Sequence, residues 1–201
     1  MTNAKICSEC LKAFEKRGRV DQFAERTSAI LNCSNNCSCA SRSVSVYSPF
    51  PIACSEDVAA CASHPHHSAI NGTVSHKVFD RAFTQGLSVT RLVLADEGIE
   101  QVLLLCSGID QRKRHREPDL YSLGAVSLKA EDVRNIKFRG CESAAFRVYD
   151  TAAQNNVAHA DIVGSKYFGK LADLPKPAQS IRSWAQLQLS KKMLFLQREP
   201  S

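Results

Sequence analysis

The stretch AAFRVYDTAAQNNVAHADIV, residues 144–163, decides the fold class of this 201-residue chain. It contains two segments, 144–151 and 157–163, in which β-branched and aromatic residues are frequent. A short polar connector, Gln154-Asn155-Asn156, lies between them. Two strand-like segments joined in this way predict a β-hairpin.

The rest of the chain mixes strand-like and helix-like periodicity without a strict strand–helix–strand alternation. This mixture is typical of α+β proteins. We therefore expect a small mixed or antiparallel sheet with flanking helices. The further strands are expected at 44–47, 89–95 and 123–128, and the helices at 9–31, 55–62, 96–106, 131–138 and 179–197.

Composition and hydropathy bound the class of protein. Hydrophobic residues make up 44% and charged residues 23% of the chain, which is typical of a globular protein. The first fifteen residues are too polar for a secretory signal, and the longest apolar run, 102–106, is far shorter than a membrane span. These features predict a cytoplasmic protein without a membrane partner. Disulfides are uncommon in the cytoplasm, so clustered cysteines favour metal binding there.

Cysteine and charge are distributed unevenly. Seven of the nine cysteines precede residue 62, whereas most of the net charge of +6 belongs to the later part of the chain. This asymmetry predicts a Cys/His-rich, metal-stabilised part over 1–75 and a basic α+β domain over 76–201. One continuous domain is the alternative.

The strongest metal signal is the pair Cys7-Ser-Glu-Cys10, because two intervening residues let both sulfurs face one ion. Cys33 and Cys37 can supply the second half of a tetrahedral site, with Cys39 as a substitute. We therefore predict a structural zinc ion, with thiols that hold no metal as the alternative.

The string Cys7-Ser-Glu-Cys10-Leu-Lys-Ala-Phe14 resembles the opening of a C2H2 zinc finger over about eight residues. That family requires two histidines soon after the second cysteine, but the first such histidine in this chain is His64. The resemblance therefore implies a zinc knuckle and no C2H2 fold.

A second candidate metal set follows in the sequence. Its members combine thiols and imidazoles at spacings that suit a metal, and they can act alone or complete the first site. The set comprises Cys54, Cys61, His64, His66 and His67. Cys106 ends an apolar run and is expected to be a buried, inert thiol.

Candidate catalytic residues lie in the C-terminal part. His159 and Asp161 are two positions apart on a predicted strand and so share a face, which Asp150 can join across the hairpin. Arg91 can supply a positive charge for a phosphate. Together they suggest general acid–base cleavage of a phosphodiester. No Ser/His/Asp signature, Walker loop or H-E-x-x-H helix occurs in the sequence.

The densest basic run is Arg112-Lys113-Arg114-His115-Arg116. Such charges contact phosphates and release counterions, which predicts RNA or DNA as a partner. A solvated loop is the alternative. The leading functional hypothesis is thus a zinc-stabilised module that binds or processes nucleic acid. The alternatives are a protein-interaction subunit with structural zinc, and a small nuclease- or transferase-like enzyme.

Overall fold

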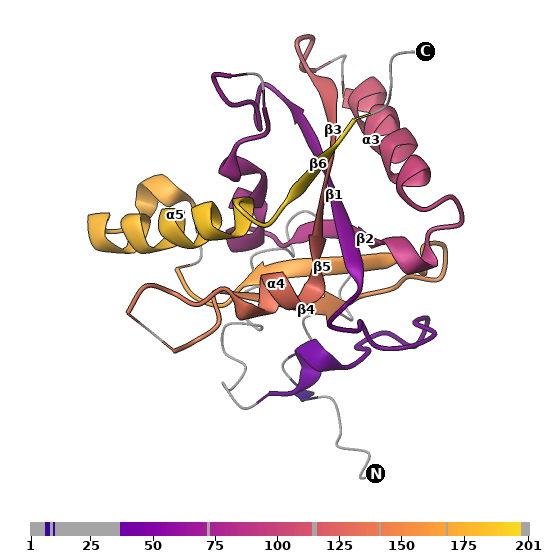
Figure 1. Ribbon diagram of the computed structural model, residues 1–201, viewed down its shortest axis with the longest axis horizontal. Coiled ribbons are helices and arrows are strands. Elements are labelled where there is room, and N and C mark those ends of the chain that lie inside the picture. The colour runs from indigo at the N-terminus through magenta and orange to yellow at the C-terminus, as the bar shows by residue number, and fades with distance from the viewer. Residues whose placement is uncertain are drawn as a thin grey trace.

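The computed structural model describes residues 7, 8, 10, 37–71, 73–113, 116–140, 142–167 and 169–197, and element labels follow Figure 1. Within these residues, six strands form one sheet in the order β4-β5-β2-β1-β3-β6, and every neighbouring pair is antiparallel. The strands are β1 (Asp57–His64), β2 (Leu87–Arg91), β3 (Tyr121–Lys129), β4 (Phe146–Asp150), β5 (His159–Gly164) and β6 (Leu194–Leu196).

In the part of the chain that the structure describes, three α-helices and four 3₁₀ helices accompany the sheet, so the predicted α+β class is confirmed. The figure shows a strong twist, with β1 and β3 running steeply across the direction of β4 and β5. The helices are α3 (Ile99–Lys113), α4 (Ala130–Asn135), α5 (Lys176–Ser190), η2 (Cys39–Ser41), η3 (His76–Phe83), η4 (Leu92–Leu94) and η5 (Leu171–Asp173).

The hairpin predicted at 144–163 is confirmed. β4 and β5 pair from Phe146 with Gly164 to Asp150 with Ala160. Their alternate residues point to opposite sides of the sheet. Phe146 and Ile162 belong to the main hydrophobic core, whereas His159 and Asp161 belong to the other face.

The main core lies on the first face of the sheet, under η3 and α5. Phe79 and Phe83 of η3 and Leu189 of α5 are fully buried against it. Phe83 also packs on Phe146, with ring centroids 5.1 Å apart. This face carries most of the apolar burial and therefore most of the hydrophobic stabilisation.

Among the described residues, two separate groups cover the second face. Over β1 and β3, helix α3 buries Val102, Leu103 and Cys106 against the sheet. Over β4 and β5, the cysteine-rich segment packs on Tyr149 and Val163. β2 lies between these two regions in the strand order.

Several expected elements are wrong. The segment 55–62, expected to be a helix, contains most of β1, a strand that pairs with a neighbour on each side. Its small apolar residues pack on both faces of the sheet, so apolar and polar residues do not alternate along it. Residues 44–47 form no strand; only a parallel bridge joins Ser43 to Asp150. The helix expected over 96–106 begins at Ile99 and continues to Lys113.

Other boundaries shift more modestly. The helix expected over 179–197 ends at Ser190, and β6 follows. Gly124, with a φ of +126°, permits this arrangement, because a Cβ there would overlap the carbonyl oxygen of Leu196. The helix expected over 9–31 lies outside the described residues apart from Cys10.

The expected division at residue 75 stays a prediction, although β1, which precedes it, pairs with β2 and β3, which follow it. Among the described residues, no helix combines the length and apolar character that a membrane span requires.

Candidate metal centre

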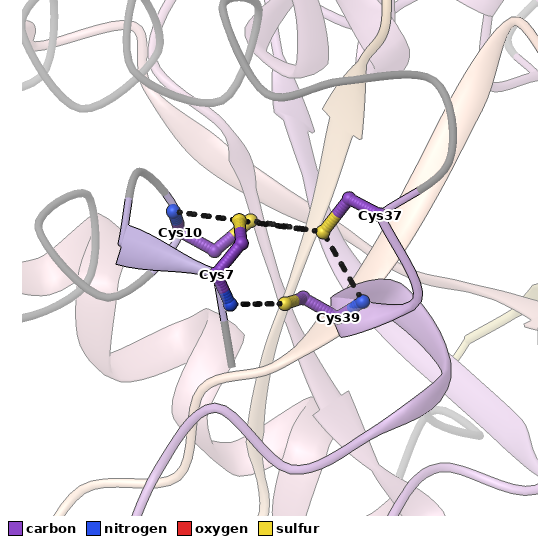
Figure 2. Close-up of side chains that lie close together, drawn as sticks. All are labelled: Cys7, Cys10, Cys37 and Cys39. Atoms are coloured by element: carbon purple, nitrogen blue, oxygen red, sulfur yellow. Dashed lines mark hydrogen bonds between the residues drawn. The ribbon is translucent and has the colours of Figure 1, made fainter. Parts of the chain in front are cut away.

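Four cysteine sulfurs converge in the N-terminal part. Those of Cys7, Cys10, Cys37 and Cys39 all lie within 4.8 Å of one another (Figure 2). The sulfur of Cys37 is 3.7 Å from that of Cys10 and 3.5 Å from that of Cys7. A tetrahedral zinc ion with Zn–S distances of about 2.3 Å requires sulfur–sulfur separations of about 3.8 Å. The cluster therefore has the dimensions of a four-thiolate metal site.

Backbone N–H groups point at these sulfurs. The N–H of Cys7 donates to the sulfur of Cys39 at 3.3 Å, and that of Cys10 donates to the sulfur of Cys7 at 3.4 Å. The N–H of Cys39 donates to the sulfur of Cys37 at 3.3 Å. Such donors stabilise negative charge on sulfur, so the backbone is arranged to support thiolates.

Burial raises the pKa of the Cys39 thiol to about 11. The hydrogen bond from the Cys7 N–H opposes this shift, whereas the nearby sulfurs of Cys37 and Cys7 add to it. Four thiolates at such close range repel one another, and a divalent cation compensates that repulsion directly.

The sheet fixes the position of the cluster. Cys39 begins the short helix η2 and is only 2% exposed, and Cys10 is fully buried. Both pack with Val44 on Tyr149 and Val163, whose side chains come from the second face of β4 and β5. The cluster thus covers one end of the sheet.

Three of the four ligands first chosen from the sequence, Cys7, Cys10 and Cys37, are in this cluster. Cys33 lies outside the described residues. Cys39, the substitute, is the fourth member. A Cys-x-Cys pair thus follows the Cys-x-x-Cys pair in the structure.

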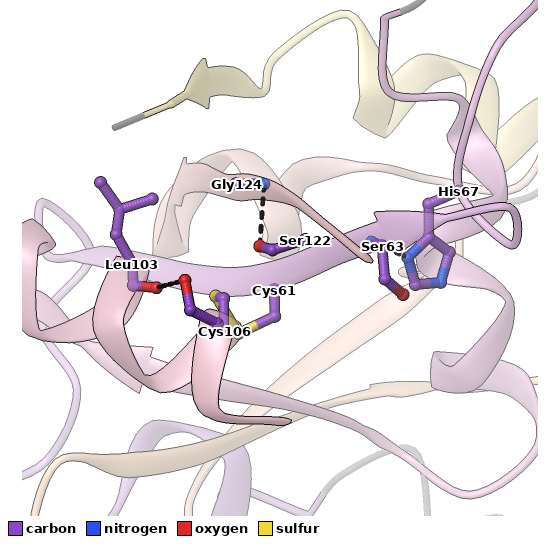
Figure 3. The surroundings of a disulfide bond; sticks show 8 residues. Cys61, Ser63, His67, Leu103, Cys106, Ser122 and Gly124 are labelled. Carbon is purple, nitrogen blue, oxygen red and sulfur yellow. Dashed lines mark hydrogen bonds between the residues drawn. A yellow bond between two sulfur atoms is a disulfide. The ribbon is translucent and has the colours of Figure 1, made fainter. Parts of the chain in front are cut away.

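The second candidate metal set does not assemble in the described residues. Cys61 is not a ligand, because its sulfur is bonded to that of Cys106, with a Cα–Cα distance of 5.3 Å (Figure 3). The expectation that Cys106 is an inert thiol is therefore wrong. The disulfide links α3 to β1, in the region where α3 packs on the second face of the sheet.

The histidines of this set have other partners. His64 hydrogen-bonds Ser68 at 2.7 Å and stacks on Tyr121. Nδ1 of His67 accepts from the N–H of Ser63 at 3.0 Å. His66 pairs with Glu117 at 2.7 Å, and its ring lies edge-on to that of His67 with centroids 6.3 Å apart. Cys54 is exposed, 3.7 Å from Nη1 of Arg134.

Arg91 does not join His159, contrary to the catalytic hypothesis. Its side chain is fully buried on the first face of the sheet, where it pairs with Glu56 at 2.6 Å and with Asp150 at 3.3 Å. Asp150 accordingly lies on the face opposite Asp161. Arg91 is therefore a structural cation of the interior.

His159 and Asp161 do share a face, as predicted, and Thr151 connects them. The Thr151 hydroxyl donates to Oδ2 of Asp161 at 2.9 Å and lies 2.9 Å from Nδ1 of His159. On its other side, Nε2 of His159 is 2.7 Å from the hydroxyl of Ser88. Sequence reasoning missed Ser88 and Thr151, because strand pairing brings them to His159 and no local motif marks them.

The basic run is described only in part. Arg112 and Lys113 close α3, Arg114 lies outside the described residues, and Arg116 is exposed. Their role in binding nucleic acid stays a prediction. A different feature is a cavity of about 480 Å³ beside Cys37, whose lining includes three cations, Arg134, Arg147 and Lys166, and one carboxylate, Glu142.

No protein-family model, curated protein or solved structure matches this chain. Its residues and their geometry alone therefore carry the functional argument.

Proposed function

We propose that this chain is a zinc-stabilised module that binds nucleic acid through its phosphates. The observation that carries the zinc half is the convergence of four sulfurs from residues 7–10 and 37–39. An all-sulfur, tetrahedral ligand set is the usual structural zinc site. Separations of 3.5 and 3.7 Å suit a single ion, whereas a multinuclear iron–sulfur cluster needs room for its own iron and sulfide between the thiolates.

The nucleic-acid half draws support from positive charge next to this cluster. Arg134, Arg147 and Lys166 line the cavity that Cys37 also borders. Arg134 already donates to the carbonyl oxygens of Ala40 and Ile52, so it holds the cavity wall. Lys166 is exposed at the rim and is the cation best placed to meet a phosphate from solvent.

Zinc content tests the first half. The purified protein should contain about one zinc per chain, and the variant Cys7→Ser/Cys10→Ser should contain none. The variant Cys54→Ser is the matched control, because Cys54 is exposed and outside the cluster, and it should keep its zinc. A purified native protein that contains no zinc would refute the zinc site.

A mobility-shift titration tests the second half. The native chain should retard labelled single-stranded RNA or DNA at about 50 mM salt and lose affinity as salt rises. Lys166→Gln and Arg116→Gln should each weaken binding, because each removes a phosphate contact. Lys191→Gln, an equal change of charge at an exposed site beyond α5, should not. Absence of a shift at about 50 mM salt rejects nucleic-acid binding and leaves the zinc site intact.

A further inference from the structure

On the second face of the sheet, four side chains form a continuous hydrogen-bonded chain. Ser88 contacts His159, His159 contacts Thr151, and Thr151 contacts Asp161, at 2.7, 2.9 and 2.9 Å. We propose that Ser88 is a nucleophile activated by His159, and that the protein cleaves carboxylic esters through an acyl-serine intermediate.

The direction of each hydrogen bond follows from the partners. Nδ1 of His159 lies 3.3 Å from the backbone carbonyl oxygen of Thr151, which can only accept. The Thr151 hydroxyl gives its proton to the Asp161 carboxylate, so towards His159 it also presents an acceptor. Nδ1 must therefore carry the imidazole proton. Nε2 is then an acceptor, and the Ser88 hydroxyl donates to it.

This order of protons is the one that a serine nucleophile requires. A neutral imidazole with a free lone pair on the nitrogen facing the serine is its general base, and a group on the other nitrogen fixes the tautomer. Asp161 is 2% exposed and Thr151 is fully buried, so the fixing groups are shielded from water. Thr151 occupies the place where many such sites have a direct carboxylate contact.

Strand register holds the constellation in place. Ser88 of β2 is paired with Asp161 of β5, and Thr90 with His159. Side chains two positions apart share a face, so Ser88 and His159 are diagonal neighbours on one rigid pair of strands. A site on paired strands keeps its geometry better than a site on loops.

The serine is accessible, as a nucleophile must be. Ser88 is exposed and His159 half-buried, whereas the alternate residues of β2 are buried. The Ser88 hydroxyl is thus open to solvent on β2. This strand lies between the part of the sheet that α3 covers and the part that the cysteine cluster covers. Arg91, the cation of β2, lies on the opposite face, which favours a neutral acyl group over a phosphate as substrate.

The proposed reaction balances as two transfers. The Ser88 oxygen attacks the ester carbonyl carbon while its proton passes to Nε2 of His159, and Asp161 compensates the imidazolium charge through Thr151. The bond from the carbonyl carbon to the alcohol oxygen then breaks, and Nε2 returns the proton to the departing alcohol. In the second transfer, Nε2 takes a proton from water, and the water oxygen attacks the acyl carbon. The bond from that carbon to the Ser88 oxygen then breaks, Nε2 returns the proton to this oxygen, and the carboxylic acid is released.

The test uses a fluorophosphonate probe and the chromogenic ester p-nitrophenyl acetate. Peptide mapping should locate the probe on Ser88, and His159→Ala should abolish this labelling. Ser88→Ala and His159→Ala should each lower ester turnover by about 100-fold or more. Thr151→Val should lower turnover less and shift its pH profile, which a purely structural threonine would not do.

Ser55→Ala is the matched control, since Ser55 is an exposed serine outside the network, and it should retain full labelling and turnover. Thermal melts of every variant establish that the fold persists. Three outcomes would overturn the proposal. The probe could fail to label Ser88, or it could label Ser88 in His159→Ala as strongly as in the native protein. The rate of ester hydrolysis could also be unchanged in Ser88→Ala. None of these readouts depends on zinc or nucleic acid, so the outcome is separate from that of the proposed function.

Discussion

Arg91 and Glu56, 35 positions apart in the chain, form a doubly hydrogen-bonded ion pair inside the protein. Nε and Nη2 of Arg91 donate to the two carboxylate oxygens at 2.6 and 3.0 Å. The same guanidinium contacts the carbonyl oxygen of Phe50 at 2.9 Å and the carboxylate of Asp150 at 3.3 Å. It therefore ties the segment before β1 to the sheet.

Removing this cation should be costly. Arg91→Met leaves two buried carboxylates without their counter-charge, and breaking a buried pair in this way typically costs about 3–5 kcal/mol. Chemical denaturation should show a loss of this size. The double variant Arg91→Met/Glu56→Gln should recover part of it, because one of the stranded charges is then gone. A loss below about 1 kcal/mol would contradict the structural role given to Arg91.

Metal removal should destabilise the cysteine-rich segment that packs on β4 and β5, while the sheet itself stays folded. A strong chelator should release the ion and expose Tyr149, which the cluster now buries completely. We expect faster proteolysis near residues 37–41 and a lower melting temperature, both reversed by added zinc. Cys54→Ser should respond to the chelator as the native protein does. Identical proteolysis with and without chelator would argue against a metal in the cluster.

The cross-link between Cys61 and Cys106 closes a loop across 45 positions. Loops of this length usually give about 2–4 kcal/mol of stabilisation. Alkylation without reductant should therefore leave both residues unlabelled, and Cys61→Ser/Cys106→Ser should lower the free energy of unfolding by that amount. Labelling of Cys106 in the folded, unreduced protein would show that the bond does not form.

Gly164 should not tolerate a side chain. A Cβ at this position would overlap the ring of Phe83, which is fully buried in the main core. Gly164→Ala should cost about 1–3 kcal/mol through overpacking. Adding Phe83→Leu should lessen the cost of the glycine substitution, measured in a double-mutant cycle by denaturation. Strict additivity of the two changes would exclude this contact as the cause.

The local patterns of the sequence predicted the hairpin and three of the four cysteines of the cluster. The hairpin depends on adjacent residues, and the Cys7–Cys10 pair forms within one turn, so both are readable from the chain. β1 could not be predicted from the sequence, because a strand buried on both faces shows no alternation of apolar and polar residues. Its alanines also favour a helix. The remaining sulfur ligand was ambiguous, since Cys33 and Cys39 have equally permissible spacings.

Relationships between distant strands were beyond the sequence. His159 and Asp161 were placed on one face correctly, but Arg91 was assigned to the same site because nothing in its neighbourhood reveals which face it takes. Ser88 and Thr151 lie beside His159 only because of the register in which β2, β4 and β5 pair. The disulfide was discounted because a cytoplasmic location was expected, and that location stays a prediction.

Both covers of the second face are fastened by sulfur, but in opposite chemical forms. One consists of four cysteines that would have to stay reduced to hold the proposed cation, and the other depends on two cysteines that must stay oxidised to hold a helix. Strong oxidants therefore threaten the first fastening and strong reductants the second. If the proposed metal is bound, the face that carries Ser88 should be fully covered only within a window of redox potential bounded on both sides, and leaving that window in either direction should uncover a different end of the sheet.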